Sequence, residues 1–365
     1  MNLDLKSEPS LKEGKGYLWV YFTGEGEGAE AINMALSKEN DALDWYTLNE
    51  GDPIIISTKG EEGLRDPFII RSFDGKKFYL IATDLKIHNR LGDGFKDAQI
   101  NGSHFIEIFE SSDLISWSQQ RHVEISSELA GNTWAPKAFW DQELEKYIVF
   151  WASNLYEERD VNKRKDVTYN RMMYVTTKDF YSFSKPQIWV DVNLGKGKGT
   201  IDATVVKEGE WYYRFMKEES TMTIRLERTK NLYAVTNGQS YSSKDASEQE
   251  WCTLGEKLGV GLPNGEGKLF TSGEGPCIIR TNQTDINAFK WLLFIDQPFY
   301  HGGPNHYVGF GSNDLSDVHS WQPVSDKLRK GLPQNKKGEK PRHGSIIALN
   351  EKEYDLIYQT YLNKK

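Results

Sequence analysis

Hydrophobic and polar positions along this chain alternate in short runs, and the pattern recurs about every 70 residues. Each repeat contains strand-like runs rich in β-branched and aromatic residues, separated by Gly, Asn and Asp turns. The first repeat has DPFIIRS (66–72), KKFYLIATD (76–84) and HFIEIFES (104–111), with an Asp-Gly turn between the first two runs. Apart from a short turn near residues 28–35, no stretch longer than two turns has a helical period. The sequence therefore predicts an all-β protein.

Two signals mark every repeat. An aromatic residue follows a polar turn, and a residue that starts an apolar strand comes about 20 residues later. The aromatic positions are Trp45, Trp117, Phe183, Trp251 and Trp321, and the strand-starting positions are Asp66, Lys137, Asp202, Glu274 and His343. Five copies of one supersecondary unit indicate a radial or stacked repeat fold. We therefore expect the five strand-starting residues to occupy equivalent positions.

The last repeat is divided between the two ends of the chain. HGSIIALN and EYDLIYQTY read as its C-terminal strands, and GYLWVYFTG, INMALS and the Trp45 segment as its N-terminal ones. Pairing both ends in one sheet closes a ring and removes its open edge. We predict a five-bladed β-propeller with four-stranded blades, forming one domain over residues 17–365 after a polar tail of residues 1–16. Which end supplies the middle strands stays open.

Composition narrows the function classes. Aromatic residues make up 13% of the chain, which is typical of carbohydrate-handling proteins, whose ring faces pack on sugar C–H surfaces. The net charge of −8 and the lack of a basic stripe argue against nucleic acid as a partner. No signal peptide or long apolar stretch is visible, so we expect no membrane partner and a cytoplasmic location, although a processed secreted form would have the same sequence. The sequence does not indicate an oligomeric state.

Three of the strand-starting residues are carboxylates, and in a propeller these positions face one mouth of the central channel. Antiparallel pairing brings the ends of the second strands to the same mouth, with Asp84, Ser153, Lys217 and Asp296. Converging carboxylates raise one another's pKa, a strain that is more often kept for function than tolerated by accident. Glycoside hydrolysis uses such a group, because one carboxyl must donate a proton while another stays ionised.

The order of Asp66 in RDPFI, Asp202 in IDATVV and Glu274 in EGP resembles the pattern of glycoside hydrolase family 43. The WAP tripeptide at 134–136 and the His-Gly pair at 343–344 also fit this family. The resemblance implies a five-bladed propeller that hydrolyses arabinosides or xylosides with inversion. It further implies Asp66 as general base, Asp202 as the residue that raises the acid's pKa, and Glu274 as general acid. No cofactor is required, but His343 would lie in the channel beside the acids or a water-bound calcium or sodium ion.

The substrate-binding residues are less well determined by the sequence. We assign Trp134, Lys137, Asp84, Arg225 and Asp296 to this role. Trp134 would be either a sugar platform or a packing residue between blades. Lys137 stands where relatives commonly carry an acid, and it would pair with Asp66 or Asp202, bind a substrate hydroxyl, or extend outward. Loop 87–103 is long, polar and Gly-rich, and we expect it to shape a subsite or lid.

The function predicted from these features is exo-acting release of α-L-arabinofuranose from arabinose-containing oligosaccharides. β-Xylosidase and β-galactofuranosidase activities are alternatives on the same scaffold. A non-catalytic glycan-binding propeller is the alternative of another class, but it would be expected to carry five similar ring residues. Retaining sucrose-cleaving enzymes carry an Asn-Asp-Pro motif that is missing here, and phosphorylases would need a cluster of basic phosphate ligands.

Overall fold

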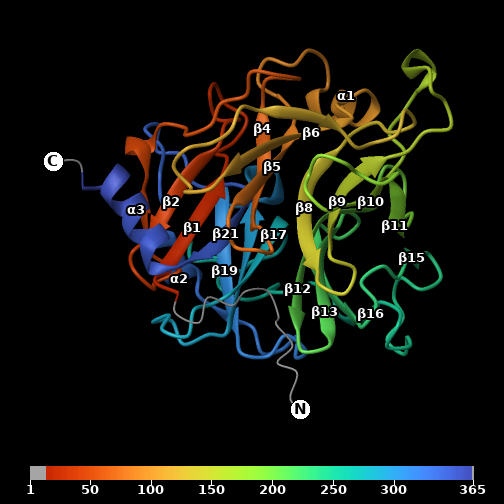
Figure 1. The fold of residues 1–365 in the computed structure, drawn as a ribbon. Coiled ribbons are helices and arrows are strands. Elements are labelled where there is room, and N and C mark those ends of the chain that lie inside the picture. The colour runs from red at the N-terminus through yellow and green to blue at the C-terminus, as the bar shows by residue number, and fades with distance from the viewer. Residues whose placement is uncertain (1–13, 364–365) are drawn as a thin grey trace.

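The structure is a computed structural model that describes residues 14–363. Most of the predicted tail lies outside this range. Five sheets surround a common axis (Figure 1). From the axis outward, blade one has β21 (Gly344–Leu349), β1 (Gly16–Tyr21), β2 (Asn33–Ser37) and β3 (Trp45–Thr47), and blade two has β4 (Leu64–Arg71), β5 (Phe78–Asp84), β6 (Phe105–Ser111) and β7 (Arg121–Glu124).

The remaining three blades follow in chain order. Blade three has β8 (Trp134–Asp141), β9 (Lys146–Asn154), β10 (Asn170–Thr177), β11 (Gln187–Asp191) and β15 (Thr236–Asn237). Blade four has β12 (Thr200–Glu208), β13 (Trp211–Glu218), β14 (Thr223–Thr229) and β16 (Cys252–Gly255). Blade five has β17 (Glu274–Arg280), β18 (Trp291–Gln297), β19 (His306–Ser312) and β20 (Gln322–Pro323). The five-bladed propeller is therefore confirmed. Blade three differs from the four-stranded pattern because β15 adds a fifth strand parallel to β11.

Blade one closes the ring as predicted. The C-terminal strand β21 is the innermost strand of this blade and pairs antiparallel with β1, with Leu18 opposite Ile347. The N-terminal part of the chain supplies the other three strands, which answers the question that the sequence left open. Figure 1 shows β21, in blue, lying beside β1, in red.

The segment EYDLIYQTY was predicted as a strand, and this prediction was wrong. It forms most of helix α3 (Glu351–Tyr361), which packs beside β1 and β2 at the outer edge in Figure 1. Asn350 caps the helix, and Glu353 completes a capping box. Tyr354 and Ile357 are buried on one helical face. Their spacing of three residues is helical, and it outweighs the strand preference of Tyr and Ile.

Two shorter α-helices and three 3₁₀ turns complete the described structure. They are α1 (Gly94–Ile100), α2 (Ser325–Gly331), η1 (Asn49–Gly51), η2 (Val161–Lys163) and η3 (Phe299–His301). Helix α1 lies within the 87–103 segment that was expected to be an irregular loop. Between residues 14 and 363, none of the helices combines the length and the apolar character needed to cross a bilayer.

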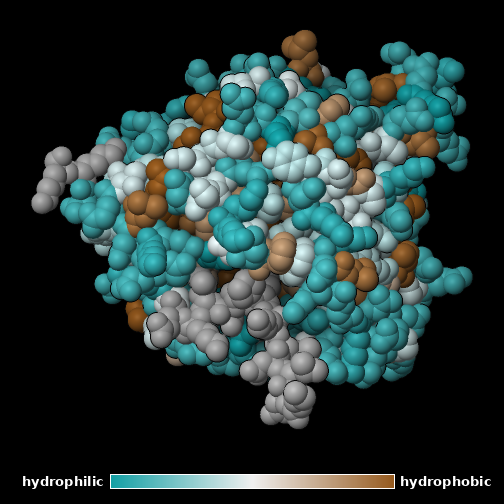
Figure 2. Space-filling view, viewed as in Figure 1, coloured by the Kyte–Doolittle hydropathy of each residue, from teal (hydrophilic) through white to brown (hydrophobic). Residues whose placement is uncertain are grey.

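Apolar side chains gather in five clusters, and each cluster lies between two neighbouring blades. The cluster between blades one and five, for example, joins Trp19 of β1 to Phe294 and Tyr307, with ring centroids 5.6 and 5.5 Å apart. Trp45, Trp251 and the other three periodic aromatics each belong to or pack against one of these clusters. The repeated aromatic is therefore an inter-blade packing residue. The face in Figure 2 is mainly hydrophilic, with apolar residues scattered over it.

The capping box of α3 provides a stability prediction. We expect Asn350→Ala to lower the free energy of unfolding by about 1 kcal/mol, because the Glu353 backbone N–H loses its acceptor. Urea denaturation measures this change. Asn363→Ala is the matched control, since the side chain of this exposed residue bonds to Gln359 and caps no helix N-terminus in the described structure. A loss as large in the control, or no loss in the Asn350 variant, would contradict the assigned cap.

Candidate active site

The inner strands of blades two to five share a local irregularity at the mouth of the channel. In each strand the pairing register shifts, and one residue within the shift has a positive φ. These residues are Asp66 (φ 50°), Ala135 (φ 51°), Asp202 (φ 60°) and Gly275 (φ 56°). They are the structurally equivalent positions, so the predicted set needs correction. Lys137 comes two residues after the bulge residue Ala135, and Glu274 comes one residue before the bulge residue Gly275.

The bulge gives Asp66 a fixed position. The Thr83 hydroxyl accepts a hydrogen bond from the Ala135 backbone N–H at 2.8 Å, so its own proton is directed to Asp66 Oδ2, also at 2.8 Å. Asp66 Oδ1 lies 3.1 Å from His343 Nδ1. Burial by itself raises the pKa of Asp66, but the hydrogen bond and charge of His343, together with Arg65, bring this pKa below its ordinary value. The carboxylate is therefore ionised at neutral pH.

Asp202 occupies the equivalent position two blades away. Its Oδ2 accepts a hydrogen bond from the Gly275 backbone N–H at 3.0 Å, and its Oδ1 lies 3.9 Å from His343 Nδ1. Burial and the nearby charge of Glu274 raise the pKa of Asp202, although His343 opposes them. Gly275 is required here, because a Cβ at this position would lie 2.6 Å from His343 Cγ.

Glu274 is surrounded by cationic and hydroxyl groups. Lys217 Nζ donates to Oε2 at 2.6 Å, His301 Nε2 lies 3.1 Å from the same oxygen, and the Tyr300 hydroxyl donates to Oε1. Arg342 lies 3.6 Å from Oε1. Burial would raise the pKa of Glu274, but Lys217, His301 and Arg342 outweigh it and hold the pKa well below its ordinary value.

Sequence reasoning missed three of these groups. Tyr300 and His301 belong to η3, in a segment that was predicted only as a rim loop, and Arg342 directly precedes the predicted His343. The signal for Arg342 is its place directly before the predicted ring residue His343, as Arg65 stands directly before Asp66. The Tyr-His pair carries no such signal, since its loop lies outside the repeat.

Asp296 lies beside the ring as predicted, but its role differs from the prediction. Its two carboxylate oxygens accept hydrogen bonds from Arg342 Nε at 2.9 and 2.8 Å, and Oδ2 also accepts one from the His343 backbone N–H at 3.2 Å. Burial raises the pKa of Asp296 to about 6, against the opposing charge of Arg342. The side chain is 0% exposed and positions Arg342 and His343, so it is not placed to contact a substrate.

Lys137 lies inside the channel rather than at its mouth. Its side chain is buried, and Nζ donates to the Pro276 carbonyl oxygen at 2.6 Å, which links blade three to blade five. Burial lowers the pKa of Lys137, although Cys277, Asp202 and Asp66 oppose this effect. Extension toward solvent and binding of a substrate hydroxyl are both excluded for this rotamer by its burial. The two-residue offset described above accounts for its deeper position.

Two other predicted substrate residues also lie away from the carboxylates. Arg225 is buried in blade four, where Nε lies 3.1 Å from Glu227 and Nη1 lies 3.2 Å from Glu218. Asp84 is buried at the end of β5, where it accepts hydrogen bonds from Ser103 and the Glu61 backbone N–H. Neither side chain is placed to contact a substrate.

Trp134 lies next to the bulge of blade three and is half-buried. Its ring meets Phe95 of α1 edge-on, with centroids 6.3 Å apart, and the Arg65 guanidinium lies 5.4 Å from the same Phe95 ring. Segment 87–103 therefore borders the residues at the channel mouth. A sugar-platform role for Trp134 stays a prediction.

The surroundings of His343 fit the predicted channel cation. Its Nδ1 faces Asp66 and Asp202, whereas its Nε2 is buried and has no hydrogen-bond partner among the described residues. An unpartnered nitrogen of this kind could hold a water bound to calcium or sodium. Such an ion would supply positive charge near the carboxylates.

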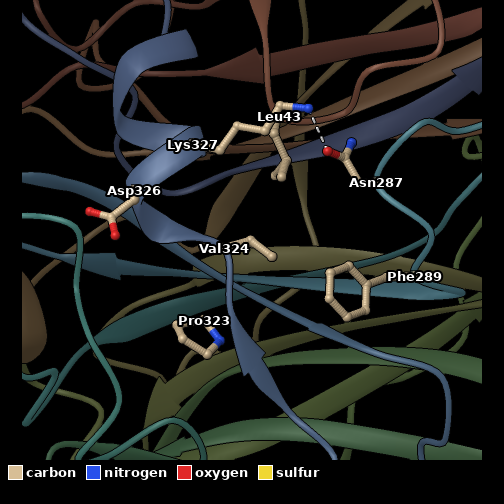
Figure 3. Close-up of a pocket in the computed structure, with 7 residues that line it drawn as sticks. All are labelled: Leu43, Asn287, Phe289, Pro323, Val324, Asp326 and Lys327. Atoms are coloured by element: carbon tan, nitrogen blue, oxygen red, sulfur yellow. Dashed lines mark hydrogen bonds between the residues drawn. The ribbon is translucent and has the colours of Figure 1, made fainter.

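The pocket in Figure 3 is separate from the carboxylates. It has a volume of about 290 Å³ and lies beside α2. Its lining residues are Leu43, Asn287, Phe289, Pro323, Val324, Asp326 and Lys327. A single carboxylate in a mainly apolar lining is not a glycosidase arrangement.

Comparisons with known proteins place the sequence in a family. Residues 13–355 match the family described as "Probable glycosyl hydrolase domain", which is related to glycoside hydrolase family 43. An α-L-arabinofuranosidase of Bifidobacterium longum subsp. longum is 34% identical over 261 residues, which are 66% of this chain. The match covers only 24% of that relative's length.

Solved structures with a similar fold include an α-L-arabinofuranosidase from Fusarium graminearum, at 13% identity and a TM-score of 0.49, with 84% of this chain and 76% of that chain covered. An exo-β-1,3-galactanase from Clostridium thermocellum has 14% identity and a TM-score of 0.44, with 73% and 50% covered. Because the family model spans nearly the whole sequence, the chain belongs to the glycosyl hydrolase family related to glycoside hydrolase family 43.

Proposed function

We propose that this glycosyl hydrolase domain is an inverting, exo-acting α-L-arabinofuranosidase that acts on short arabinose-containing oligosaccharides. The observation that carries the catalytic part is the convergence of Asp66, Asp202 and Glu274 around His343 and the Gly275 backbone. The relative named α-L-arabinofuranosidase supports the choice of sugar. Action on short oligosaccharides rests on the predicted cytoplasmic location, since polymers do not enter cells intact.

In the proposed reaction, Asp66 is the general base. Its low pKa keeps it ionised, and Thr83 and His343 hold its two oxygens in place. The carboxylate takes a proton from water as that water attacks the anomeric carbon. Glu274 donates a proton to the glycosidic oxygen as the bond to the leaving group breaks.

Proton supply is the step that this site must regulate. Lys217 and its neighbours hold Glu274 ionised in the free protein, whereas burial favours a proton on Asp202. Glu274 must therefore gain a proton before it can act as the acid. We propose that a sugar entering the site separates Glu274 from Lys217 and excludes water, because loss of a cationic partner and burial both raise a carboxyl pKa.

We expect Lys217→Met to shift the pH dependence of activity. Glu274 must be protonated for turnover, so kcat/KM falls as pH rises through its pKa in the free enzyme. Removing Lys217 raises that pKa, so we expect the alkaline limb of the kcat/KM profile to move to higher pH. Lys207→Met is the control, because Lys207 bonds to Tyr212 and not to the site. An unchanged limb, or one that moves to lower pH, would contradict the role of Lys217.

The aromatic side chains near the mouth suggest where the sugar lies. Tyr300 is 60% exposed although its hydroxyl contacts Glu274, and the adjacent Phe299 is 72% exposed. We propose that these rings contact the leaving-group side of the substrate, next to the acid. Trp134 and Phe95 would then border the sugar that is released.

The deciding experiment compares aryl α-L-arabinofuranosides, β-D-xylosides and β-D-galactofuranosides, with NMR detection of the first anomer released. We expect the arabinofuranoside to give the highest kcat/KM and the inverted anomer to appear first. A retained anomer would refute the water-mediated route. Preference for a xyloside or galactofuranoside would keep the mechanism and change the substrate. Binding of all three without turnover would indicate a glycan-binding propeller.

A further inference from the structure

A second group of ionisable side chains lies in blade two, outside the proposed catalytic site. Asp84 ends β5, Glu107 lies in the middle of β6, and His122 lies in β7. One ligand atom from each residue lies within 4.8 Å of the other two. His122 Nδ1 contacts Glu107 Oε1 directly and lies 4.0 Å from Asp84 Oδ2. We infer that these three residues form a binding site for a divalent transition-metal ion, with Zn²⁺ as the ion that fits best.

Two buried carboxylates in this group lack a cationic side chain of lysine or arginine within residues 14–363. The side chains of Asp84 and Glu107 are 1% and 0% exposed. Some other buried carboxylates pair with arginine, as Asp296 does with Arg342 and Glu227 with Arg214. Among the described residues, no lysine or arginine forms an ion pair with Asp84 or Glu107. Two buried carboxylates thus face only a histidine, and a dication would balance them.

Surrounding hydrogen bonds orient each carboxylate toward the common centre. Gln120 Nε2 donates to Glu107 Oε2 at 2.6 Å, which leaves Oε1 to face His122. Ser103 donates to Asp84 Oδ2 at 2.6 Å, and the Glu61 backbone N–H donates to Oδ1 at 2.7 Å. Outer partners of this kind fix ligand geometry in metal sites.

The imidazole is also held in place. The His122 ring stacks on Phe105, with centroids 4.0 Å apart and planes 5° from parallel. Its side chain is 24% exposed, so an ion can enter from this side, whereas both carboxylates are closed off by protein.

The donor set selects the class of ion. Calcium takes six to eight oxygen ligands, and magnesium keeps several waters in an octahedron of oxygens. Two carboxylates and one imidazole nitrogen suit Zn²⁺, which takes three protein ligands and a water in an open site. Asp84 directly follows Thr83, which orients Asp66. An ion here would therefore fix the end of β5 beside the proposed general base.

The test uses untagged protein treated with a chelator and then titrated with ZnCl₂ by calorimetry, with bound metal measured by mass spectrometry. MnCl₂, CaCl₂ and MgCl₂ are titrated in parallel. We expect one Zn²⁺ per chain and a higher melting temperature with Zn²⁺ present. No Zn²⁺ binding, or tighter binding of Ca²⁺ or Mg²⁺ than of Zn²⁺, would overturn the proposal.

Variants locate the site. Glu107→Gln keeps the side-chain shape and removes one charge. We expect it to weaken Zn²⁺ affinity by more than about tenfold, because even the loss of a residue that only hydrogen-bonds to a metal ligand weakens affinity by at least about tenfold. His122→Gln, at a partly exposed position, tests the same site if the first variant does not fold. Glu266→Gln is the matched control, because it breaks another His–Glu pair in which His306 lies 3.1 Å from Glu266. Equal affinity in parent and His122→Gln would refute the site, and so would a loss confined to Glu266→Gln. These binding readouts do not depend on glycosidase activity.

Discussion

Glu274→Gln is expected to lower kcat/KM by about 10²–10⁴-fold for a substrate whose leaving group needs protonation, such as an arabino-oligosaccharide. The amide cannot donate a carboxyl proton to the glycosidic oxygen. It keeps the shape of the side chain, and its single amide oxygen can still accept the hydrogen bond from Lys217 or the one from Tyr300. The loss should therefore come from chemistry rather than from disturbed packing. Steady-state kinetics on the oligosaccharide and on a dinitrophenyl arabinofuranoside measure it.

The dependence of the rate on the leaving group distinguishes the general acid from the other carboxylates. An activated aryl group departs without protonation, so the dinitrophenyl substrate should recover most of the rate in Glu274→Gln. Asp202→Asn is the matched variant, because burial and Glu274 raise the pKa of Asp202. If Asp202→Asn shows the leaving-group dependence and Glu274→Gln does not, Asp202 is the proton donor and the proposed assignment is wrong.

Asp66→Asn is the second substitution with a large expected effect. We expect it to lower kcat/KM by about 10²–10⁴-fold with every leaving group. The base acts on water, so an activated leaving group gives no recovery. Asn tolerates the positive φ of 50° at this position, and its side-chain oxygen can accept the hydrogen bond from Thr83. Unfolding and circular dichroism should therefore match those of the parent protein.

A companion variant tests how Asp66 is positioned. Thr83→Val removes the hydroxyl that joins the Ala135 N–H to Asp66, so kcat should fall while the carboxylate remains. We expect this loss to be smaller than that of Asp66→Asn. Substantial activity in Asp66→Asn, or recovery of its rate with the dinitrophenyl substrate, would remove Asp66 from the role of base.

The sequence was informative where a feature repeats. Five periodic aromatics predicted five blades, because each one packs between neighbouring blades in the structure. The three carboxylates were also found, since each lies at or beside the start of an inner strand. The prediction failed at α3, where Tyr and Ile favoured a strand by propensity while their spacing and the Asn350 cap favoured a helix. Local preference alone does not determine which of two patterns is used.

What the sequence by itself determined was the five-bladed plan, the ring closure through both chain ends, and the acids Asp66, Asp202 and Glu274. Those features depend on periodicity along the chain, which the residues record directly. The tertiary structure alone decided that Lys137 lies inside the channel, that Lys217, His301 and Arg342 surround Glu274, and that Asp84 faces Glu107 and His122. The physical reason is that bulges set side-chain direction within a strand, and contacts between distant segments set the charge around each carboxyl. The bulges recur at residues of different type, and the charge around each carboxyl does not repeat along the chain, so both appear only when the blades are packed together.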